Sequence, residues 1–60
     1  MIGYRRGGSI VVVNPRGEAA RTAIAAEGID GARDLLTGRM QRGSELELAA
    51  YGVAVLELAD

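Results

Sequence analysis

The stretch that decides the fold is Ile10-Val11-Val12-Val13-Asn14-Pro15-Arg16-Gly17. Its run of four β-branched residues predicts a strand over Ser9–Val13, because branched side chains fit a pleated sheet and lose rotamer freedom in a helix. Both alternating faces of this strand are apolar, which is typical of a central strand that is covered on two sides. The next four residues form a turn, in which Pro15 lacks the N–H that a continuing ladder needs. The strand therefore ends at Asn14.

Three other segments extend the pattern. Met1–Arg6 is predicted to be a first strand, joined to the central one by a tight hairpin at Gly7-Gly8. Ser44–Leu48 alternates leucine with glutamate, which predicts a half-exposed strand near a sheet edge. Tyr51–Leu58 is apolar on both faces and is predicted to be a second central strand.

The segment Glu18–Glu27 is ambiguous when only its residues are considered. Its alanine-rich composition favours a helix, with Pro15 before its start and Gly28 at its end. Its alternation favours a weak strand that returns from the turn, with Ala20, Thr22 and Ile24 on one side. Both structures stay open at this point.

Glycines divide the middle of the chain into short pieces. Ala32–Leu36 is predicted to be extended, and Leu36–Arg39 is predicted to be a tight turn with Gly38 in the left-handed conformation. Met40–Arg42 follows, and Gly43 marks a further turn. Turns that recur at such short intervals predict an all-β fold: one small domain over residues 1–60, built as an antiparallel sandwich or meander of about six to seven short strands.

Composition limits both stability and partners. A chain of 60 residues buries only about 60% of the surface that it exposes when unfolded, and this one has no cysteine or histidine with which to form a disulfide or a zinc site. We therefore expect a partner to contribute stability. The net charge of −1, with seven arginines and no lysine, gives no electrostatic case for binding nucleic acid or an anionic membrane.

Hydropathy offers no targeting segment. The longest apolar run, Tyr51–Leu56, is far shorter than the roughly 20 residues of a membrane span. No charged start followed by an apolar stretch resembles a signal peptide, so we expect the cytoplasm as the location.

The inventory of reactive side chains is poor. Without histidine, cysteine or lysine, the usual general base, thiol nucleophile and Schiff-base amine are missing. Glu45 and Glu47 suggest a glycosidase pair, but their spacing places them about 7 Å apart in a solvent-facing row with no enclosing pocket. We expect them to form a solvated surface and predict no catalytic residue in this chain.

Metal and cofactor sites are also not expected. Glu27, Asp30 and Asp34 carry oxygen ligands, but no loop has the dense acidic alternation of a calcium site. Asp34 is predicted instead to accept hydrogen bonds from backbone N–H groups of the following turn. Gly7-Gly8-Ser9 lacks the lysine and the helix of a phosphate-binding loop, and a hairpin turn explains it.

Two further groups of residues suggest binding. Arg5-Arg6 is a basic doublet that either docks on an acidic surface or keeps an edge soluble. Tyr4 and Tyr51 raise the possibility of sugar stacking, but two tyrosines are fewer aromatics than such platforms use, so sugar contact is not expected. Tyr51 beside Gly52 is predicted to be a packing anchor whose hydroxyl reaches the surface.

Three ordered segments resemble a known domain: Ile10–Asn14, Ala32–Gly38 and Leu46–Leu56. Together they resemble the small C-terminal domain of β-galactosidases of glycoside hydrolase family 42. In that domain a hydrophobic strand ends in Asn, an Asp-Leu-Leu-Thr-Gly turn follows, and a strand of the type Leu-x-Leu-Pro-Pro-Tyr-Gly-Val-x-Val-Leu closes the chain. The resemblance covers residues 9–58. Similar elements close the C-terminal β-sandwich domains of α-amylase-family enzymes.

The chain departs from this pattern at two places. Ala49-Ala50 stands where proline is common, which loosens the bend before the last strand. The alanine-rich stretch 19–26 replaces a more β-branched strand. The resemblance nevertheless favours a strand for Glu18–Ile24.

What the resemblance implies about function is indirect. In those enzymes the catalytic glutamates lie on a (β/α)₈ barrel upstream, so no catalytic residue transfers to this chain. The implied role is a non-catalytic accessory domain of a β-galactosidase-type glycosidase, which packs against the other domains of the enzyme and stabilises them. Two alternatives remain: a stand-alone carbohydrate-binding module, and a self-associating β protein whose partner is a second copy of itself.

Overall fold

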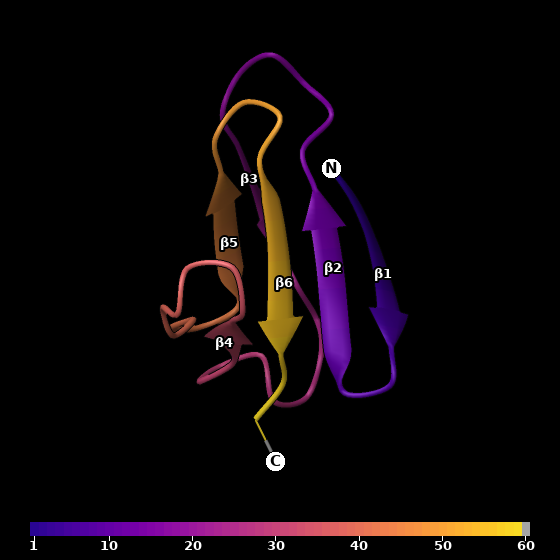
Figure 1. Ribbon diagram of the computed structural model, residues 1–60, viewed down its shortest axis with the longest axis vertical. Coiled ribbons are helices and arrows are strands. Elements are labelled where there is room, and N and C mark those ends of the chain that lie inside the picture. Colours follow the sequence, from indigo (N-terminus) through magenta and orange to yellow (C-terminus); the bar gives the residue numbers. More distant parts are fainter. Residues whose placement is uncertain (60) are drawn as a thin grey trace.

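The computed structural model describes residues 1–59 as two antiparallel sheets (Figure 1). Sheet A has the strand order β1-β2-β6-β4, and sheet B pairs β3 with β5. The strands are β1 (Ile2–Arg6), β2 (Ser9–Val13), β3 (Ala20–Ala23), β4 (Arg33–Asp34), β5 (Glu45–Leu48) and β6 (Val53–Glu57). No helix occurs in residues 1–59, and the predicted all-β class is confirmed.

The two central strands lie where the sequence predicted them. β1 and β2 form a hairpin in which Arg6 pairs with Ser9 across Gly7-Gly8, and Gly7 adopts a φ of 59°. This positive φ is accessible to glycine at little cost and is typical of tight hairpin turns. β2 pairs on its other side with β6, from Ser9↔Glu57 to Val13↔Val53. The predicted hairpin and both central positions are confirmed.

β3 resolves the ambiguity in the segment Glu18–Glu27. Ala20–Ala23 is a strand, so the helical alternative is wrong. Ala20 pairs with Leu48 and Thr22 with Leu46, which turns the inner side of β3 toward the core. Pairing with a strongly alternating partner outweighs the helical propensity of alanine, which amounts to only a few tenths of a kcal/mol per residue.

The core lies between the two sheets. Sheet A contributes alternate residues of β2 and β6, and sheet B contributes the leucines of β5. Two further residues, Ile29 and Ala32, come from the irregular segment between β3 and β4. The buried apolar residues are Ile10, Val12, Ile29, Ala32, Leu46, Leu48, Ala54 and Leu56.

Coverage of the central strands differs from the prediction. Ile10 and Val12 are buried under sheet B, but Val11 and Val13 on the opposite face of β2 are only half-buried. β6 repeats this pattern, with Ala54 and Leu56 inside and Val53 exposed. The prediction that the strand at Ser9–Val13 is covered on two sides is wrong within this chain, because residues 1–59 supply a second layer on one side only.

The middle of the chain is less regular than predicted. The extended piece expected over Ala32–Leu36 is a strand only at Arg33–Asp34, which pairs with β6. The following turn is confirmed: Gly38 has a φ of 78°, and its N–H donates to the Asp34 carbonyl at 2.7 Å. The turn is further stabilised by the N–H of Leu36, which donates to Asp34 Oδ1 at 2.9 Å.

Asn14 connects the two turns at one end of the sandwich. It is completely buried, and its backbone N–H donates to the Gly52 carbonyl at 2.9 Å. Its Nδ2 group donates to the carbonyls of Glu18 at 2.8 Å and Ala49 at 3.0 Å, with a longer contact to Leu48 at 3.4 Å. Its Oδ1 accepts the N–H of Arg16 at 3.1 Å. A single side chain thus satisfies backbone groups of both the β2–β3 and the β5–β6 connections.

We predict that Asn14→Ala destabilises the fold by about 2–4 kcal/mol, because it removes several hydrogen bonds and leaves buried carbonyls unpaired. Asn14→Asp should cost at least as much, since it directs a carboxylate oxygen at the carbonyls that now accept from Nδ2. Urea unfolding followed by circular dichroism measures both changes. The control Thr37→Ala, which removes one exposed hydrogen bond, should stay within about 0.5 kcal/mol. Equal stability of the Asn14→Asp variant and the unsubstituted chain would contradict the assigned role of Nδ2.

Candidate functional site

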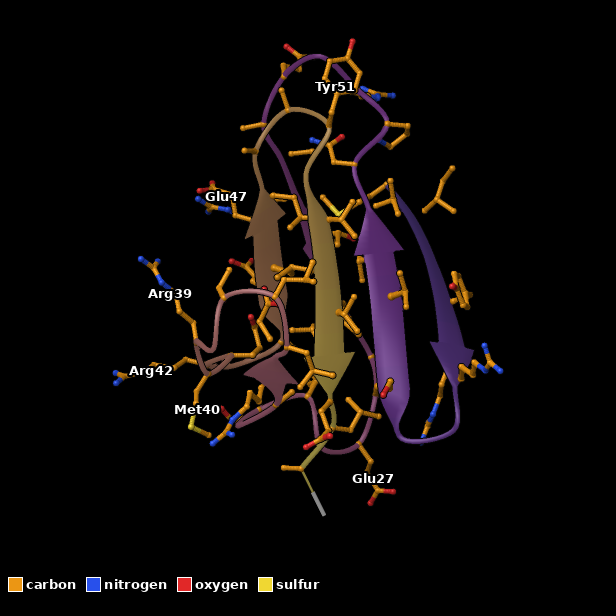
Figure 2. All side chains as sticks on the ribbon, in the orientation of Figure 1. Glu27, Arg39, Met40, Arg42, Glu47 and Tyr51 are labelled. Atoms are coloured by element: carbon orange, nitrogen blue, oxygen red, sulfur yellow. The ribbon has the colours of Figure 1, made fainter. Side chains whose placement is uncertain are left out.

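The paired glutamates lie on the solvent side of sheet B. Glu45 and Glu47 have side chains that are 70% and 62% exposed, and Glu47 projects away from the sandwich (Figure 2). Both approach the guanidinium group of Arg21 on β3, with N···O separations of 4.0 Å for Glu45 and 3.1 Å for Glu47. Since this arrangement offers no enclosed acid–base pair, it acts as a charged surface.

Two aspartate carboxylates accept hydrogen bonds from the backbone. Asp34 accepts the N–H of Leu36 as predicted, and Asp30 Oδ1 accepts the N–H of Gly43 at 2.9 Å. Glu27 lies apart at the end of the molecule near the C-terminus (Figure 2). Within residues 1–59 no group of three or more potential ligand residues is placed to hold a metal ion.

The two tyrosines occupy different elements. Tyr4 lies in the middle of β1 opposite Val11, whereas Tyr51 lies in the turn between β5 and β6 (Figure 2). Tyr51 is 71% exposed, and its ring and hydroxyl lie close to Gly17. The prediction that Tyr51 is a packing anchor is therefore wrong in its main part. A φ of 55° at Tyr51 directs the ring outward from the turn.

The outer face of sheet A is the most distinctive surface of the molecule. Strand register aligns its side chains in rows, because partners in an antiparallel ladder share one face. One row contains Ile2, Val13 and Val53, and the next contains Tyr4, Val11 and Val55. Leu35 extends the second row, since its N–H donates to the Val55 carbonyl at 2.8 Å directly after β4. We call these seven residues the apolar face: Ile2, Tyr4, Val11, Val13, Leu35, Val53 and Val55.

Charged residues border the apolar face at one end. Arg6 pairs with Ser9, Ser9 with Glu57, and Glu57 with Arg33, so a polar row crosses the whole sheet. No such apolar set exists on the outer side of sheet B within the described chain, where Arg21, Glu45 and Glu47 face solvent. The two outer faces therefore differ in kind, and only the face of sheet A has the chemistry of a contact surface.

The exposed area agrees with this asymmetry. The folded chain exposes 4208 Å², whereas a compact monomer of its mass is expected to expose roughly 3,700 Å². The excess of roughly 500 Å² is consistent with the incomplete burial of a small two-layer domain. The apolar face includes strongly exposed side chains, with Ile2 at 62% and Tyr4 at 60%.

A comparison with protein families decides what kind of domain this is. The family model described as the beta-galactosidase C-terminal domain matches residues 22–58, which is more than half of the chain. The chain belongs to this family, that of the C-terminal domains of glycoside hydrolase family 42. No curated protein and no solved structure gives a significant match.

Within this beta-galactosidase C-terminal domain, the match begins inside β3 at Thr22, covers β4, β5 and β6, and includes the Asp34–Gly38 turn and the Leu46–Leu56 segment. The segment Ile10–Asn14, which also resembles the family, precedes the matched residues. The domain contains no helix in residues 1–59 that is long and apolar enough to cross a membrane.

Sequence reasoning missed part of the apolar face. It identified the two-sided strands, but it did not assign Ile2, Tyr4 and Leu35 to the same surface. The two-residue hairpin at Gly7-Gly8 carried the necessary signal for β1, because a loop of that length sets the register that places Tyr4 opposite Val11. No local signal identifies Leu35, whose position depends on the pairing of β4 with β6.

The turn that lacks the family's prolines gives a first prediction. The Gly52 N–H donates to the Ala49 carbonyl at 2.9 Å, so Ala50 occupies the second position of a turn, where proline is favoured. Ala50→Pro should stabilise the domain by about 0.4–1 kcal/mol, mainly by restricting the unfolded chain. Thermal unfolding measures the gain, and Ala25→Pro in the strand-to-loop region serves as a comparison outside the turn. A loss of stability on Ala50→Pro would contradict this assignment of the turn.

The apolar face gives a second prediction. The isolated domain should enhance the fluorescence of a hydrophobic dye, and the double variant Ile2→Lys/Val53→Lys should reduce that signal severalfold, because both side chains are exposed on the face. Its unfolding free energy should change by less than about 1 kcal/mol. The control Glu45→Lys, on the opposite outer side, should leave dye binding unchanged. Equal loss of fluorescence in the control would show that the dye reports on general charge.

Proposed function

We propose that this domain is a non-catalytic accessory module that packs against the catalytic body of a family 42 β-galactosidase and stabilises it. The observation that carries the proposal is the apolar face of sheet A, whose central strands have a covering layer on their inner side only. Membership of the family supports a β-galactosidase as the larger protein. The partner is accordingly the other domains of that enzyme.

The size of the apolar face supports contact within one polypeptide. Three strands of five residues, β1, β2 and β6, spaced about 4.8 Å apart, give a footprint of roughly 250 Å², to which the short β4 side adds little. Stable complexes between separate proteins bury about 800 Å² on each partner, whereas contacts between domains of one chain are often smaller. A covalent connection supplies a high effective concentration, which makes a small interface sufficient.

The chemistry of the domain supports a role without catalysis. Its exposed glutamates share Arg21 on an open surface, and the carboxylates of Asp30 and Asp34 hold backbone N–H groups. In these four side chains the carboxylates serve structure and solvation. Hydrolysis of the glycosidic bond is therefore assigned to residues outside this domain.

The proposal is tested in a chimera in which this domain replaces the C-terminal domain of a characterised family 42 β-galactosidase. We expect the chimera to resist heat inactivation longer than the same enzyme without a C-terminal domain, with a similar rate of hydrolysis of a chromogenic galactoside before heating. The substitutions Val11→Lys and Val55→Lys in the apolar face should abolish the protection. The isolated domain should hydrolyse none of the substrate.

Controls separate docking from folding. Glu47→Lys changes charge on the opposite outer side and should keep the protection, while circular dichroism of each isolated variant reports whether it folds. A chimera that is protected equally with and without the apolar-face substitutions would refute this docking surface. Turnover by the isolated domain that is lost in a Glu45→Ala/Glu47→Ala variant would refute the non-catalytic assignment.

A further inference from the structure

The two layers of the sandwich have unequal widths. Sheet A has four strands and sheet B has two, so one side of sheet A extends beyond sheet B. In Figure 1, β1 lies at the outer side of sheet A, whereas β3 lies behind β6 and no strand lies behind β1. This arrangement leaves one edge of β3 beside an open space under the β1–β2 hairpin.

The free edge of β3 presents unpaired backbone groups. The N–H of Ile24 donates to the Ser44 carbonyl at 2.8 Å, which continues the ladder between β3 and β5. In an antiparallel ladder, alternate residues turn their N–H and C=O groups toward the same partner. Thr22 and Ile24 therefore bond toward β5, and Arg21, Ala23 and Ala25 direct their backbone groups toward the open side. Within residues 1–59 these outward backbone groups have no backbone partner.

The opposite edge of sheet B, along β5, has a backbone carbonyl that a side chain already occupies. There the carbonyl of Glu45 on β5 accepts a hydrogen bond from Nε2 of Gln41, whose side chain also reaches the carbonyls of Arg42 and Gly43. Edge strands without such protection can pair with another strand. The small side chains of Ala23 and Ala25 place no charge at the free edge of β3, and the guanidinium of Arg21 is directed toward Glu45 and Glu47 on β5.

A groove of about 390 Å³ lies along this free edge. β1 contributes Gly3 and Arg5, β2 contributes Ile10 and Val12, and the β3 side contributes Ala23 and Ala25. Gly3 lacks a side chain on the inner face of β1, which keeps the groove open. The guanidinium of Arg5 is exposed at the groove, where its Nε donates to the Gly7 carbonyl at 3.2 Å.

We propose that this groove binds an extended peptide segment of a partner protein, which adds a third strand to sheet B by pairing with β3. The unpaired groups of Arg21, Ala23 and Ala25 recognise the peptide backbone. Alternate apolar side chains of the peptide pack against the half-buried Ile24, beside the buried Ile10 and Val12. A carboxylate at the next inward position pairs with Arg5. The groove borders the apolar face, since Ile2 and Tyr4 line both, but pairing with the edge of β3 does not depend on the proposed function.

The shape of the groove favours a single peptide over a second copy of the domain. β1 projects beyond β3, so the space beside β3 is bounded by the hairpin on one side. A second folded copy would bring its own projecting β1 to the same place as it presented its own β3. An extended peptide has only the width of one strand and avoids this collision.

The test uses the synthetic peptide acetyl-Thr-Glu-Thr-Val-Thr-Val-Thr-amide, which has a carboxylate and two valines at alternate positions. Hydrogen exchange of the isolated domain is followed by NMR as the peptide concentration rises. We expect the amides of Arg21, Ala23 and Ala25 to exchange at least tenfold more slowly with saturating peptide. The amides of Thr22 and Ile24, which already bond toward β5, should change much less.

Two comparisons isolate backbone pairing from apolar contact. A peptide of the same sequence with N-methyl groups on the amides that face β3 should bind at least tenfold more weakly. Ala23→Pro removes an outward N–H without affecting the ladder to β5, and it should weaken binding of the original peptide by a similar factor. Ala23→Val keeps the N–H and is the matched control.

Three results would overturn the proposal. Equal binding of the methylated peptide, or no protection at millimolar peptide, would overturn the proposal. Protection of the same amides that grows with the concentration of the domain alone would identify a second copy as the occupant and would also overturn it. If Ala23→Pro does not fold, the two peptides compared on the unsubstituted domain still give the answer.

Discussion

The fold depends on a buried amide that joins its two halves. Asn14 directly follows the central strand β2. Its side chain forms hydrogen bonds with backbone groups of the β2–β3 connection and of the β5–β6 connection. Without cysteine or a metal site, a chain of this size has few other means of holding two sheets in one arrangement. Asn14 is also the buried polar residue of the described chain, so its hydrogen bonds form where water does not compete. These hydrogen bonds fix the end of β2 relative to the β5–β6 turn that contains Tyr51.

Incomplete coverage of sheet A explains the exposed apolar surfaces of the domain. Two strands of sheet B cover the inner face of β2 and β6, which is enough to bury Leu56 and Ala54 but leaves the β1 side open. The outer face of sheet A has no covering layer in residues 1–59. The narrow sheet B leaves the groove beside β3, and the lack of an outer layer in the described residues leaves the apolar face exposed. A β domain of 60 residues has too little chain to enclose four strands on both sides.

Family membership and chemistry agree on the kind of function to expect. The match to the beta-galactosidase C-terminal domain connects the chain with a hydrolase, while its own carboxylates lie on an open surface or hold turns. The distinguishing features of this domain are therefore the outer faces of its two sheets. Its two outer faces are opposite in character, with valines, Ile2 and Tyr4 on one and an arginine between two glutamates on the other. This polarity distinguishes a side suited to burial from a side suited to water.

The sequence by itself determined the strands whose signals are local. Ile10–Val13, the Gly7-Gly8 hairpin, the Asp34–Gly38 turn and the alternating Glu45–Leu48 strand follow from branching, turn chemistry and period-two alternation, all of which act between near neighbours. Only the tertiary structure decided the rest. Ala20–Ala23 became a strand because β5 was available to pair with it, Ile29 and Ala32 entered the core from a loop, and Leu35 joined the apolar face through the pairing of β4 with β6. These outcomes depend on contacts between distant segments, and the free energy of such contacts exceeds the small local preferences that the sequence displays.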